Sequence, residues 1–226
     1  MARGPRAIIF DFDGVIADSE PLHLAAFQQA LEPEGIILTT EAYYADYLGY
    51  DDYDAIVAAL REAGRPPTEE TVQALMAAKA EHFLALVREG VRILPGVPTF
   101  IRTAATRAPL AVASGALRRE IELILAYAGL RQAFEAIVSA EDVSEGKPAP
   151  ESFLTALERL KERAPGLVPG DCLVIEDSRA GIEGARRAGM RCLAVTNSYP
   201  ASELGAADVV VPSLERVEWD RIAALF

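Results

Sequence analysis

The sequence predicts an α/β protein in which a parallel sheet is interrupted, after its first strand, by an inserted bundle of helices. Residues 7–12 are expected to form a strand, because this segment opens on the uninterrupted apolar run AIIF, which is typical of a strand covered on both faces. From residue 93 onward, short apolar runs alternate with segments of helical periodicity. This alternation predicts a parallel sheet with right-handed crossovers, whose ligand binds beyond the carboxyl ends of the strands.

The block of residues 19–92 shows helical patterns and no strand pattern. Its expected helices cover 21–32, 41–49, 51–64 and 68–89, with Thr68 capping the last one. Later strands are expected at 110–114, 134–139, 172–176, 191–196 and 208–211, and helices at 98–106, 118–128, 151–163, 180–188 and 218–225. We therefore expect a core domain of residues 1–17 and 93–226 and an α-helical cap domain of residues 18–92, with hinges near 17–19 and 91–95.

Charge and composition exclude several classes of partner. The net charge of −12 argues against a nucleic acid or an anionic membrane, because both select for basic patches. The N-terminal apolar run is too short for a signal peptide, and no apolar run approaches the roughly 20 residues that span a bilayer. Cys172 and Cys192 fall in expected strands and indicate reduced core cysteines, with a disulfide as the alternative. We expect a cytoplasmic protein, monomeric or weakly dimeric.

Two aspartates, Asp11 and Asp13, follow the first strand directly. In an extended segment, side chains two residues apart point to the same side, so both carboxylates face one small space. They repel each other unless a cation lies between them. Gly14 follows and permits a backbone turn that a bulkier residue resists. Folding alone does not place paired acids after AIIF, and we interpret them as a site.

Two further candidates lie near the ends of later strands. Ser114 and Gly115 offer a hydroxyl and backbone amides near a helix start, which suit a phosphate oxygen, although Ser114 taken alone is more simply a helix cap. Lys147 stands in SEGKPAP, a loop stiffened by prolines; taken alone, a loop lysine is usually solvated. Both residues gain meaning only in combination with the acids.

Glu176 and Asp177 close another hydrophobic strand, in LVIEDSRAG. The simple alternative is that Asp177 or the following Ser178 caps the next helix. Combined with Asp11 and Asp13, however, these oxygens favour a hard cation, for which Mg²⁺ is expected. A lysine and a hydroxyl opposite that cation form a clamp for a phosphoryl group, and a carboxylate is a competent nucleophile toward phosphorus.

Four stretches resemble, in order and spacing, the motifs of the haloacid dehalogenase superfamily: DFDGVIADSE, the serine after VA, GKPAP and LVIEDSRAGIEGARRAG. Within it the chain is most similar to the β-phosphoglucomutase-like phosphatases, which carry an α-helical cap after the first motif. The resemblance covers nearly the whole chain. It implies a Rossmann-like catalytic core and a Mg²⁺-dependent phosphatase that works through a phospho-aspartate.

The resemblance also implies residue roles. Asp11 is the expected nucleophile and Asp13 the expected general acid and base. The expected metal site is formed by Asp11, the Asp13 backbone carbonyl, Glu176 and Asp177; the expected substrate-binding residues are Gly14, Ser114, Gly115, Lys147 and His23. Glu176 is the weaker expectation, because adjacent strand residues point to opposite sides. Dehalogenating members lack an aspartate two residues after the first acid, so Asp13 argues for phosphate-ester chemistry.

The cap segment bears on substrate choice. Residues 19–92 hold 13 Asp and Glu against 5 Lys and Arg. The related mutases carry a cap arginine for a second phosphate, and here Asp52 falls about where it would be, which favours a phosphatase over a mutase. Lys79 lies near a cap lysine of the mutases, but we expect an exposed helix lysine. His23 matches a histidine common in relatives and either assists proton traffic or cap closure, or lies on a helix surface.

Five of the seven tyrosines also fall in the cap segment: Tyr43, Tyr44, Tyr47, Tyr50 and Tyr53. Packing between cap helices is the expected reason, with a substrate-facing wall as the alternative. The leading hypothesis is a phosphatase acting on a small phosphorylated metabolite. The alternatives are a phosphomutase of the β-phosphoglucomutase type and a catalytically silent binding protein of the same fold. The sequence does not name the substrate.

Overall fold

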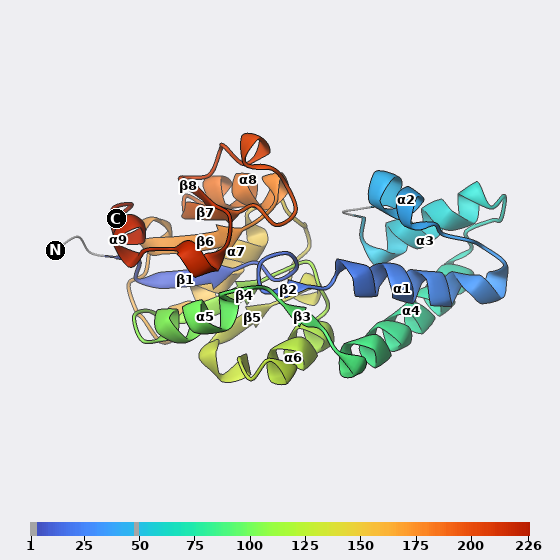
Figure 1. The fold of residues 1–226 in the computed structure, drawn as a ribbon, viewed down its shortest axis with the longest axis horizontal. Coiled ribbons are helices and arrows are strands. Elements are labelled where there is room, and N and C mark those ends of the chain that lie inside the picture. The colour runs from blue at the N-terminus through green and yellow to red at the C-terminus, as the bar shows by residue number, and fades with distance from the viewer. Residues whose placement is uncertain (1–3, 48–49) are drawn as a thin grey trace. The chain divides into compact units, whose positions relative to one another are not determined.

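The computed structural model describes residues 4–47 and 50–226, and the chain divides into two compact units. The core unit consists of Met1–Asp18 and Arg92–Phe226, and the helical unit of Ser19–Val91. Figure 1 shows the strands gathered in the core unit, whereas the elements of the helical unit are helices. The predicted fold class is confirmed.

The core unit is built on a six-stranded sheet in which every neighbouring pair is parallel. Its strands lie in the order β5-β4-β1-β6-β7-β8. Their bounds are β1 Ala7–Phe10, β4 Leu110–Ala113, β5 Ala136–Val138, β6 Cys172–Glu176, β7 Arg191–Val195 and β8 Val209–Val211. The four residues of β1 are fully buried, which explains its uninterrupted apolar sequence.

Strand β1 is the point where the strand order reverses. Phe10 pairs with Val112 in β4 on one side and with Ile175 in β6 on the other. The chain runs outward from β4 to β5 on the first side and from β6 to β8 on the second. In such sheets the crevice beyond the carboxyl end of the switch strand is the usual ligand site. Asp11 is the residue that follows β1.

Helices cover both faces of the sheet. On one face Ile9 shares a buried cluster with α7 (Glu151–Leu160) and α8 (Arg179–Arg187). On the other, Phe10 meets Phe100 of α5 (Val97–Ala105) edge-on at 6.1 Å, and Phe100 stacks on Trp219 of α9 (Trp219–Ala223) at 5.1 Å. Helix α6 (Arg118–Tyr127) connects β4 with β5.

The helical unit has its own apolar core. Its elements are α1 Glu20–Leu31, the single turn α2 Thr40–Ala42, α3 Asp52–Glu62 and the long α4 Glu69–Glu89. Phe27 of α1, Leu60 of α3 and Val72 of α4 are buried together. The N-cap prediction at Thr68 is confirmed, since its hydroxyl accepts a hydrogen bond from the Thr71 amide at 3.3 Å.

Two local features differ from the sequence prediction. The helix expected at 41–49 is α-helical only through Ala42 and continues as a π-helical turn over Tyr43–Tyr47; residues 48 and 49 lie outside the described part of the chain. A two-stranded antiparallel ladder was not predicted: β2 (Ala17–Asp18) pairs with β3 (Arg92–Ile93). Strands of two residues are too short to show a period of two.

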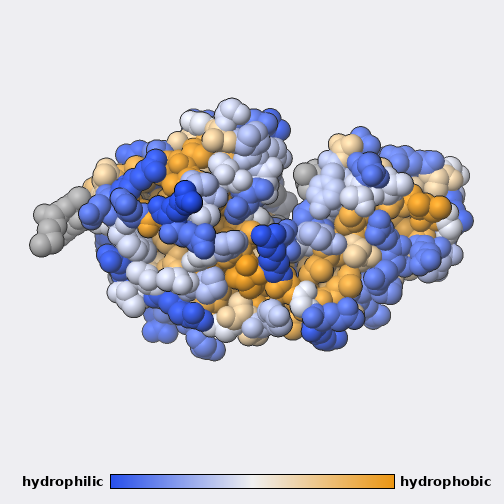
Figure 2. All heavy atoms as spheres, viewed as in Figure 1, coloured by the Kyte–Doolittle hydropathy of each residue, from blue (hydrophilic) through white to orange (hydrophobic). Residues whose placement is uncertain are grey.

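The face of the molecule in Figure 2 mixes hydrophilic residues with several hydrophobic patches. None of the helices described here combines the length and the hydropathy that crossing a membrane requires.

Candidate active site

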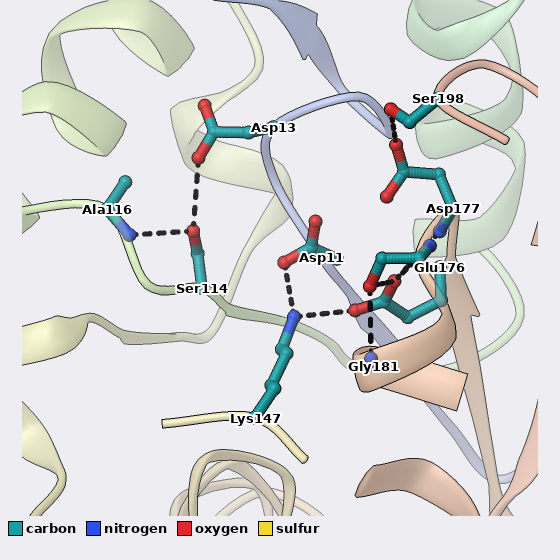
Figure 3. A network of polar contacts seen from close by, with 10 residues as sticks. Asp11, Asp13, Ser114, Ala116, Lys147, Glu176, Asp177, Gly181 and Ser198 are labelled. Atoms are coloured by element: carbon teal, nitrogen blue, oxygen red, sulfur yellow. Dashed lines mark hydrogen bonds and ion pairs between the residues drawn. The ribbon is translucent and has the colours of Figure 1, made fainter. Parts of the chain in front are cut away.

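Asp11 lies at the centre of the polar network in Figure 3, just past the end of β1. It is 8% exposed, and its Oδ1 atom forms an ion pair with the ammonium of Lys147. The same ammonium donates to Oε1 of Glu176 at 2.7 Å. Lys147 is therefore held between two carboxylates, and the alternative of a solvated loop lysine is wrong.

Glu176 ends β6 and is fully buried. Its second oxygen, Oε2, accepts from the backbone amides of Asp177 and Ser178 at 2.8 and 2.9 Å and from the Ser178 hydroxyl at 2.9 Å. A Cβ at position 181 would lie 1.7 Å from Oε1, so Gly181 leaves the space that this carboxylate fills. The buried charge is thus fully hydrogen-bonded, as a buried carboxylate must be.

Asp177 follows the end of β6 and is 3% exposed. Its Oδ2 atom accepts a hydrogen bond from the hydroxyl of Ser198, in the loop after β7. A Cβ on Gly14 would lie 1.9 Å from the same oxygen, and Gly14 has a φ of +74°, so two independent reasons favour glycine there. The neighbouring Asn197 donates to the Gly14 carbonyl at 2.7 Å and fastens this turn.

Among the residues that the structure describes, Asp11, Glu176 and Asp177 form a group that could hold a metal ion, with ligand oxygens all within 4.8 Å of one another. The expectation that Glu176 and Asp177 point to opposite sides is wrong, because Asp177 lies past the strand, where the alternation of side chains ends. Asp13 adds a fourth carboxylate to the network in Figure 3, in which the Lys147 ammonium contacts Asp11 and Glu176, whereas Asp13 points toward Ser114 and Asp177 toward Ser198. The excess of negative charge and the all-oxygen donors fit a hard divalent cation.

Burial perturbs the acids of this group. Desolvation raises the pKa of Asp11 well above its ordinary value, against the opposing charge of Lys147 and with the help of Glu176. Burial, followed by the charge of Glu176, likewise raises the pKa of Asp177 to about 7. Both shifts disfavour the ionised carboxylates in the metal-free site, so a bound cation would favour their charged forms.

Asp13 faces a different part of the site. Its Oδ2 atom lies 3.5 Å from the Ser114 hydroxyl, which in turn accepts from the Ala116 amide at 3.0 Å. Ser114 is 2% exposed, whereas Gly115 is exposed. Ser114 does not cap a helix, because α6 begins at Arg118 with Leu117 as its N-cap residue.

Asp177 and Ser178 were the two candidates for capping the helix that follows β6, and only Ser178 does so. Ser178 is the N-cap of α8, and its hydroxyl accepts from the Gly181 amide at 3.0 Å. Asp177 does not cap this helix, so its carboxylate remains within the acidic group.

The helical unit contains a second buried charge, Lys79, and the expectation of an exposed helix lysine is wrong. Its ammonium donates to both oxygens of Asp52, at 2.7 and 2.9 Å, and bonds to Nδ1 of His23 at 2.9 Å. All three N–H bonds of the ammonium thus have partners. Phe27 and Phe83 flank it at 4.9 and 5.2 Å from their ring centroids. The sequence alone does not reveal the pairing that makes burial tolerable.

His23 is not a free surface histidine either. Its ring stacks on Phe83 with centroids 4.2 Å apart. Burial, and then the charge of Lys79, lowers the pKa of His23 well below its ordinary value. The ring is therefore neutral, with Nδ1 as acceptor and the proton on Nε2.

Replacing Asp52 by alanine is expected to lower the free energy of unfolding by about 3 kcal/mol, because the fully buried ammonium of Lys79 loses its counter-ion. Urea unfolding followed by far-UV circular dichroism measures this loss. The matched control is Asp54→Ala in the same first turn of α3, which removes an exposed carboxylate. Equal losses in the two variants would contradict the role of the buried pair.

The tyrosines of the helical unit divide into two groups. Tyr43 and Tyr47 are buried, and their hydroxyls donate to Glu20 at 2.5 Å and Glu62 at 2.8 Å, so they pack inside the unit. The other three are exposed: Tyr44, Tyr50 and Tyr53.

Comparison with known proteins places the chain in a family. A family model described as haloacid dehalogenase-like hydrolase matches residues 8–195. The chain is 31% identical to protein CbbY of Rhodobacter capsulatus (97% of this chain, 98% of the relative) and 34% identical to fructose-1-phosphate phosphatase YqaB of Escherichia coli (81% and 92%). A crystal structure of CbbY from Rhodobacter sphaeroides in complex with xylulose-(1,5)bisphosphate superposes with a TM-score of 0.81 at 28% identity, covering 94% of this chain and 96% of that one.

The chain therefore belongs to the haloacid dehalogenase-like hydrolases. Within that family it is a phosphoric monoester hydrolase, in agreement with the function expected from the motifs.

Proposed function

We propose that the protein hydrolyses a small phosphorylated sugar or polyol through a phospho-aspartate on Asp11. One observation carries the proposal: a buried carboxylate stands at the switch point of the sheet, beside a lysine and two further acids. Phosphate-ester hydrolysis by this group requires a nucleophile, a positive clamp for the phosphoryl oxygens and a cation, and the described residues offer or fit all three.

Asp11 attacks phosphorus with one carboxylate oxygen while the bond to the leaving alcohol breaks. Asp13 protonates that leaving oxygen and then, as a carboxylate, takes a proton from the water that hydrolyses the acyl phosphate. Lys147 and the Ser114 hydroxyl hold the phosphoryl oxygens, and the backbones of Gly14, which follows Asp13, and of Gly115, which follows Ser114, are further proposed contacts. Support for these roles comes from the contacts of Lys147 with Asp11 and of Ser114 with Asp13.

The cation we propose is Mg²⁺, held by Asp11, the backbone carbonyl of Asp13 and Asp177, with Glu176 completing the acidic group. When bound, it neutralises the negative charge that otherwise repels a phosphate. The hydrogen bonds described for Asp177 use only Oδ2, which leaves Oδ1 for a ligand bond. Glu176 already accepts from Lys147 and from the turn before α8, so its main task is to orient that lysine.

We assign residues 1–17 and 93–226 to catalysis and residues 18–92 to a cap that selects the leaving group, with His23 as its proposed contact to substrate. The relatives include a fructose-1-phosphate phosphatase, which supports a phosphorylated carbohydrate as substrate class. The ammonium of Lys79 is already paired with the carboxylate of Asp52, so this lysine offers no spare positive charge for a second phosphate. That pairing supports hydrolysis rather than mutase chemistry.

We also propose a cytoplasmic monomer. Both cysteines, Cys172 and Cys192, are free and buried, which agrees with a reducing compartment.

A panel of phosphorylated sugars, polyols and small acids, assayed in Mg²⁺ for released phosphate, tests the proposed function. We expect hydrolysis of one or more phosphorylated carbohydrates. Product analysis by chromatography separates the two chemistries: an isomerised sugar phosphate without phosphate release would overturn the phosphatase in favour of a mutase. No turnover across the panel, with metal bound, would favour a silent binding protein.

Metal affinity is expected to depend on pH. Because the pKa of Asp177 is raised to about 7 without a metal, a proton competes with Mg²⁺ below that pH. Affinity for Mg²⁺ should weaken about tenfold between pH 8 and pH 6, as measured by isothermal titration calorimetry. The effect of Asp177 on the stability of the metal-free fold has the opposite sign: because its pKa is higher in the folded than in the unfolded chain, its contribution to the free energy of unfolding rises as pH falls from 7 toward 4. A pH-independent affinity would contradict the assignment.

A further inference from the structure

A second charged cluster lies in the core unit, centred on Asp142, outside the residues that the proposed mechanism uses. Asp142 ends the 3₁₀ turn that follows β5. Its Oδ2 atom accepts from the amide and the hydroxyl of Ser139, both at 2.9 Å, and from Nη2 of Arg118 at 2.5 Å. Its Oδ1 atom accepts from Nη2 of Arg159 at 2.7 Å. One carboxylate thus takes four hydrogen bonds from two sides.

The two arginines share a second acceptor. Arg118 donates to the carbonyl of Ile137 at 3.0 Å, and Arg159 donates to the same carbonyl at 2.5 Å. Arg118 is the first residue of α6, and Arg159 lies in the last turn of α7. The cluster therefore joins the end of β5 to two helices. The hydrogen bond from Arg159, together with those from Ser139, holds the pKa of Asp142 well below its usual range, which keeps the carboxylate charged.

The segment from β5 to Asp142 is also hydrogen-bonded to the loop that contains Ser114. The Ser114 amide donates to the carbonyl of Val138 at 3.0 Å, and the Ala140 amide donates to the carbonyl of Ala116 at 3.0 Å. The loop is thus hydrogen-bonded at Ser114 itself and at Ala116 to residues 138 and 140, which lie between β5 and Asp142. A displacement of that chain would move Ser114.

The same segment leads to Lys147, five residues after Asp142. Glu151, the first residue of α7, accepts from the amides of Ser144 at 3.0 Å and Glu145 at 2.8 Å. Helix α7 therefore fixes this loop at two points, through Arg159 to Asp142 and through Glu151 to the loop itself. The helix is a rigid support, because its apolar side is buried in the core: Phe153, Ala156, Leu157 and Leu160.

We propose that Asp142, held by Arg118 and Arg159, is a positioning residue that sets the separation of Ser114 and Lys147 and thereby the affinity for the phosphoryl group. The inference rests on the proposed function, because it takes these two residues as the phosphoryl clamp. Asp142 acts through the backbone of the two loops and does not touch substrate. Small displacements of such contacts weaken phosphoryl binding strongly, since charge-assisted hydrogen bonds depend on distance and angle.

The test compares Asp142→Asn with Asp208→Asn. Asp208 is a matched control, since it also accepts from an arginine, Arg191 at 3.0 Å, and from a backbone amide, Cys192 at 2.8 Å. It immediately precedes β8, the strand at the other edge of the sheet. With p-nitrophenyl phosphate, Asp142→Asn should raise KM and the inhibition constant of inorganic phosphate about tenfold, whereas Asp208→Asn should leave both within about twofold.

Affinity for inorganic phosphate is also measured by calorimetry, without turnover. If the wild type hydrolyses nothing, the proposed function fails, and the phosphate affinities of the two variants still decide the positioning role. Equal phosphate affinity in Asp142→Asn and the wild type would overturn the proposal, even if the melting temperature falls. Should Asp142→Asn not fold, Arg159→Gln, which changes a side chain that is 36% exposed, takes its place with the same expected result.

Discussion

Replacing Asp11 by asparagine is expected to lower kcat/KM for phosphate-ester hydrolysis by about 10⁴-fold or more, because the amide cannot attack phosphorus. Asparagine keeps the size of the side chain, and it removes a carboxylate whose pKa burial already raises. The fold should therefore survive, with an unchanged or higher melting temperature in the absence of metal. Steady-state kinetics with p-nitrophenyl phosphate in Mg²⁺, together with circular dichroism, measures both effects.

The control for Asp11→Asn is Asp18→Asn. Asp18 lies seven residues after Asp11, and its carboxylate forms an ion pair with Arg92 at 3.3 Å. This variant should retain activity within about threefold, since an exposed ion pair contributes little. Full activity in Asp11→Asn would refute the phospho-aspartate mechanism. A loss of secondary structure in that variant would contradict the account of burial instead.

Replacing Lys147 by methionine is expected to lower kcat/KM by about 10³-fold, because its ammonium is the proposed contact for phosphoryl charge. A second effect concerns stability. The carboxylates of Asp11 and Glu176 lose the cation between them, so the metal-free variant should be less stable by about 3 kcal/mol at pH 8. Urea unfolding measures the change, and Lys161→Met, at an exposed lysine paired with Glu158, is the control.

The stability loss in Lys147→Met should shrink at pH 5.5. Burial raises the pKa of Asp11 and that of Asp177, so both take up protons as pH falls and their mutual repulsion declines. Saturating Mg²⁺ at pH 8 should also restore part of the stability, since the cation opposes the same charges. A loss that is independent of both pH and Mg²⁺ would contradict the electrostatic account of this lysine.

The parallel sheet was predictable because every buried strand leaves a local signal. Strands covered on both faces read as short apolar runs, and the turns and helices between them have their own composition. The same logic located the acids, since Asp11 and Glu176 each close such a run. Because the carboxyl ends of parallel strands lie at the same edge of a sheet, Asp11 and Glu176 were expected to lie in one site.

The contacts that hold the site were less accessible to sequence reasoning. Ser198 and Asn197 follow β7 and have no motif of their own, yet they fix Asp177 and Gly14. The available signal was their position after a strand of the same sheet. For Gly181 the available signal was a glycine in the first turn of a helix that directly follows two buried acids.

The main wrong prediction concerned a buried charge, because Lys79 was expected on the surface and is fully buried. A lysine on an amphipathic helix is usually exposed, and nothing local to Lys79 announces that Asp52, from another helix, supplies its counter-ion. The charged cluster around Asp142 was not predictable for the same reason, because its two arginines come from helices that are separated in sequence. Such pairings depend on tertiary packing, which single-sequence periodicity does not encode.

The most direct test of the central claim is to identify the phosphorylated residue during turnover. Asp13→Asn should accumulate the intermediate with p-nitrophenyl phosphate, because this leaving group departs without a proton while hydrolysis of the acyl phosphate lacks its base. Rapid acid quench and peptide mass spectrometry should then place a hydroxylamine-labile phosphoryl group on Asp11. Turnover of the wild type with no such adduct in either protein, or with the adduct on another residue, would contradict the account.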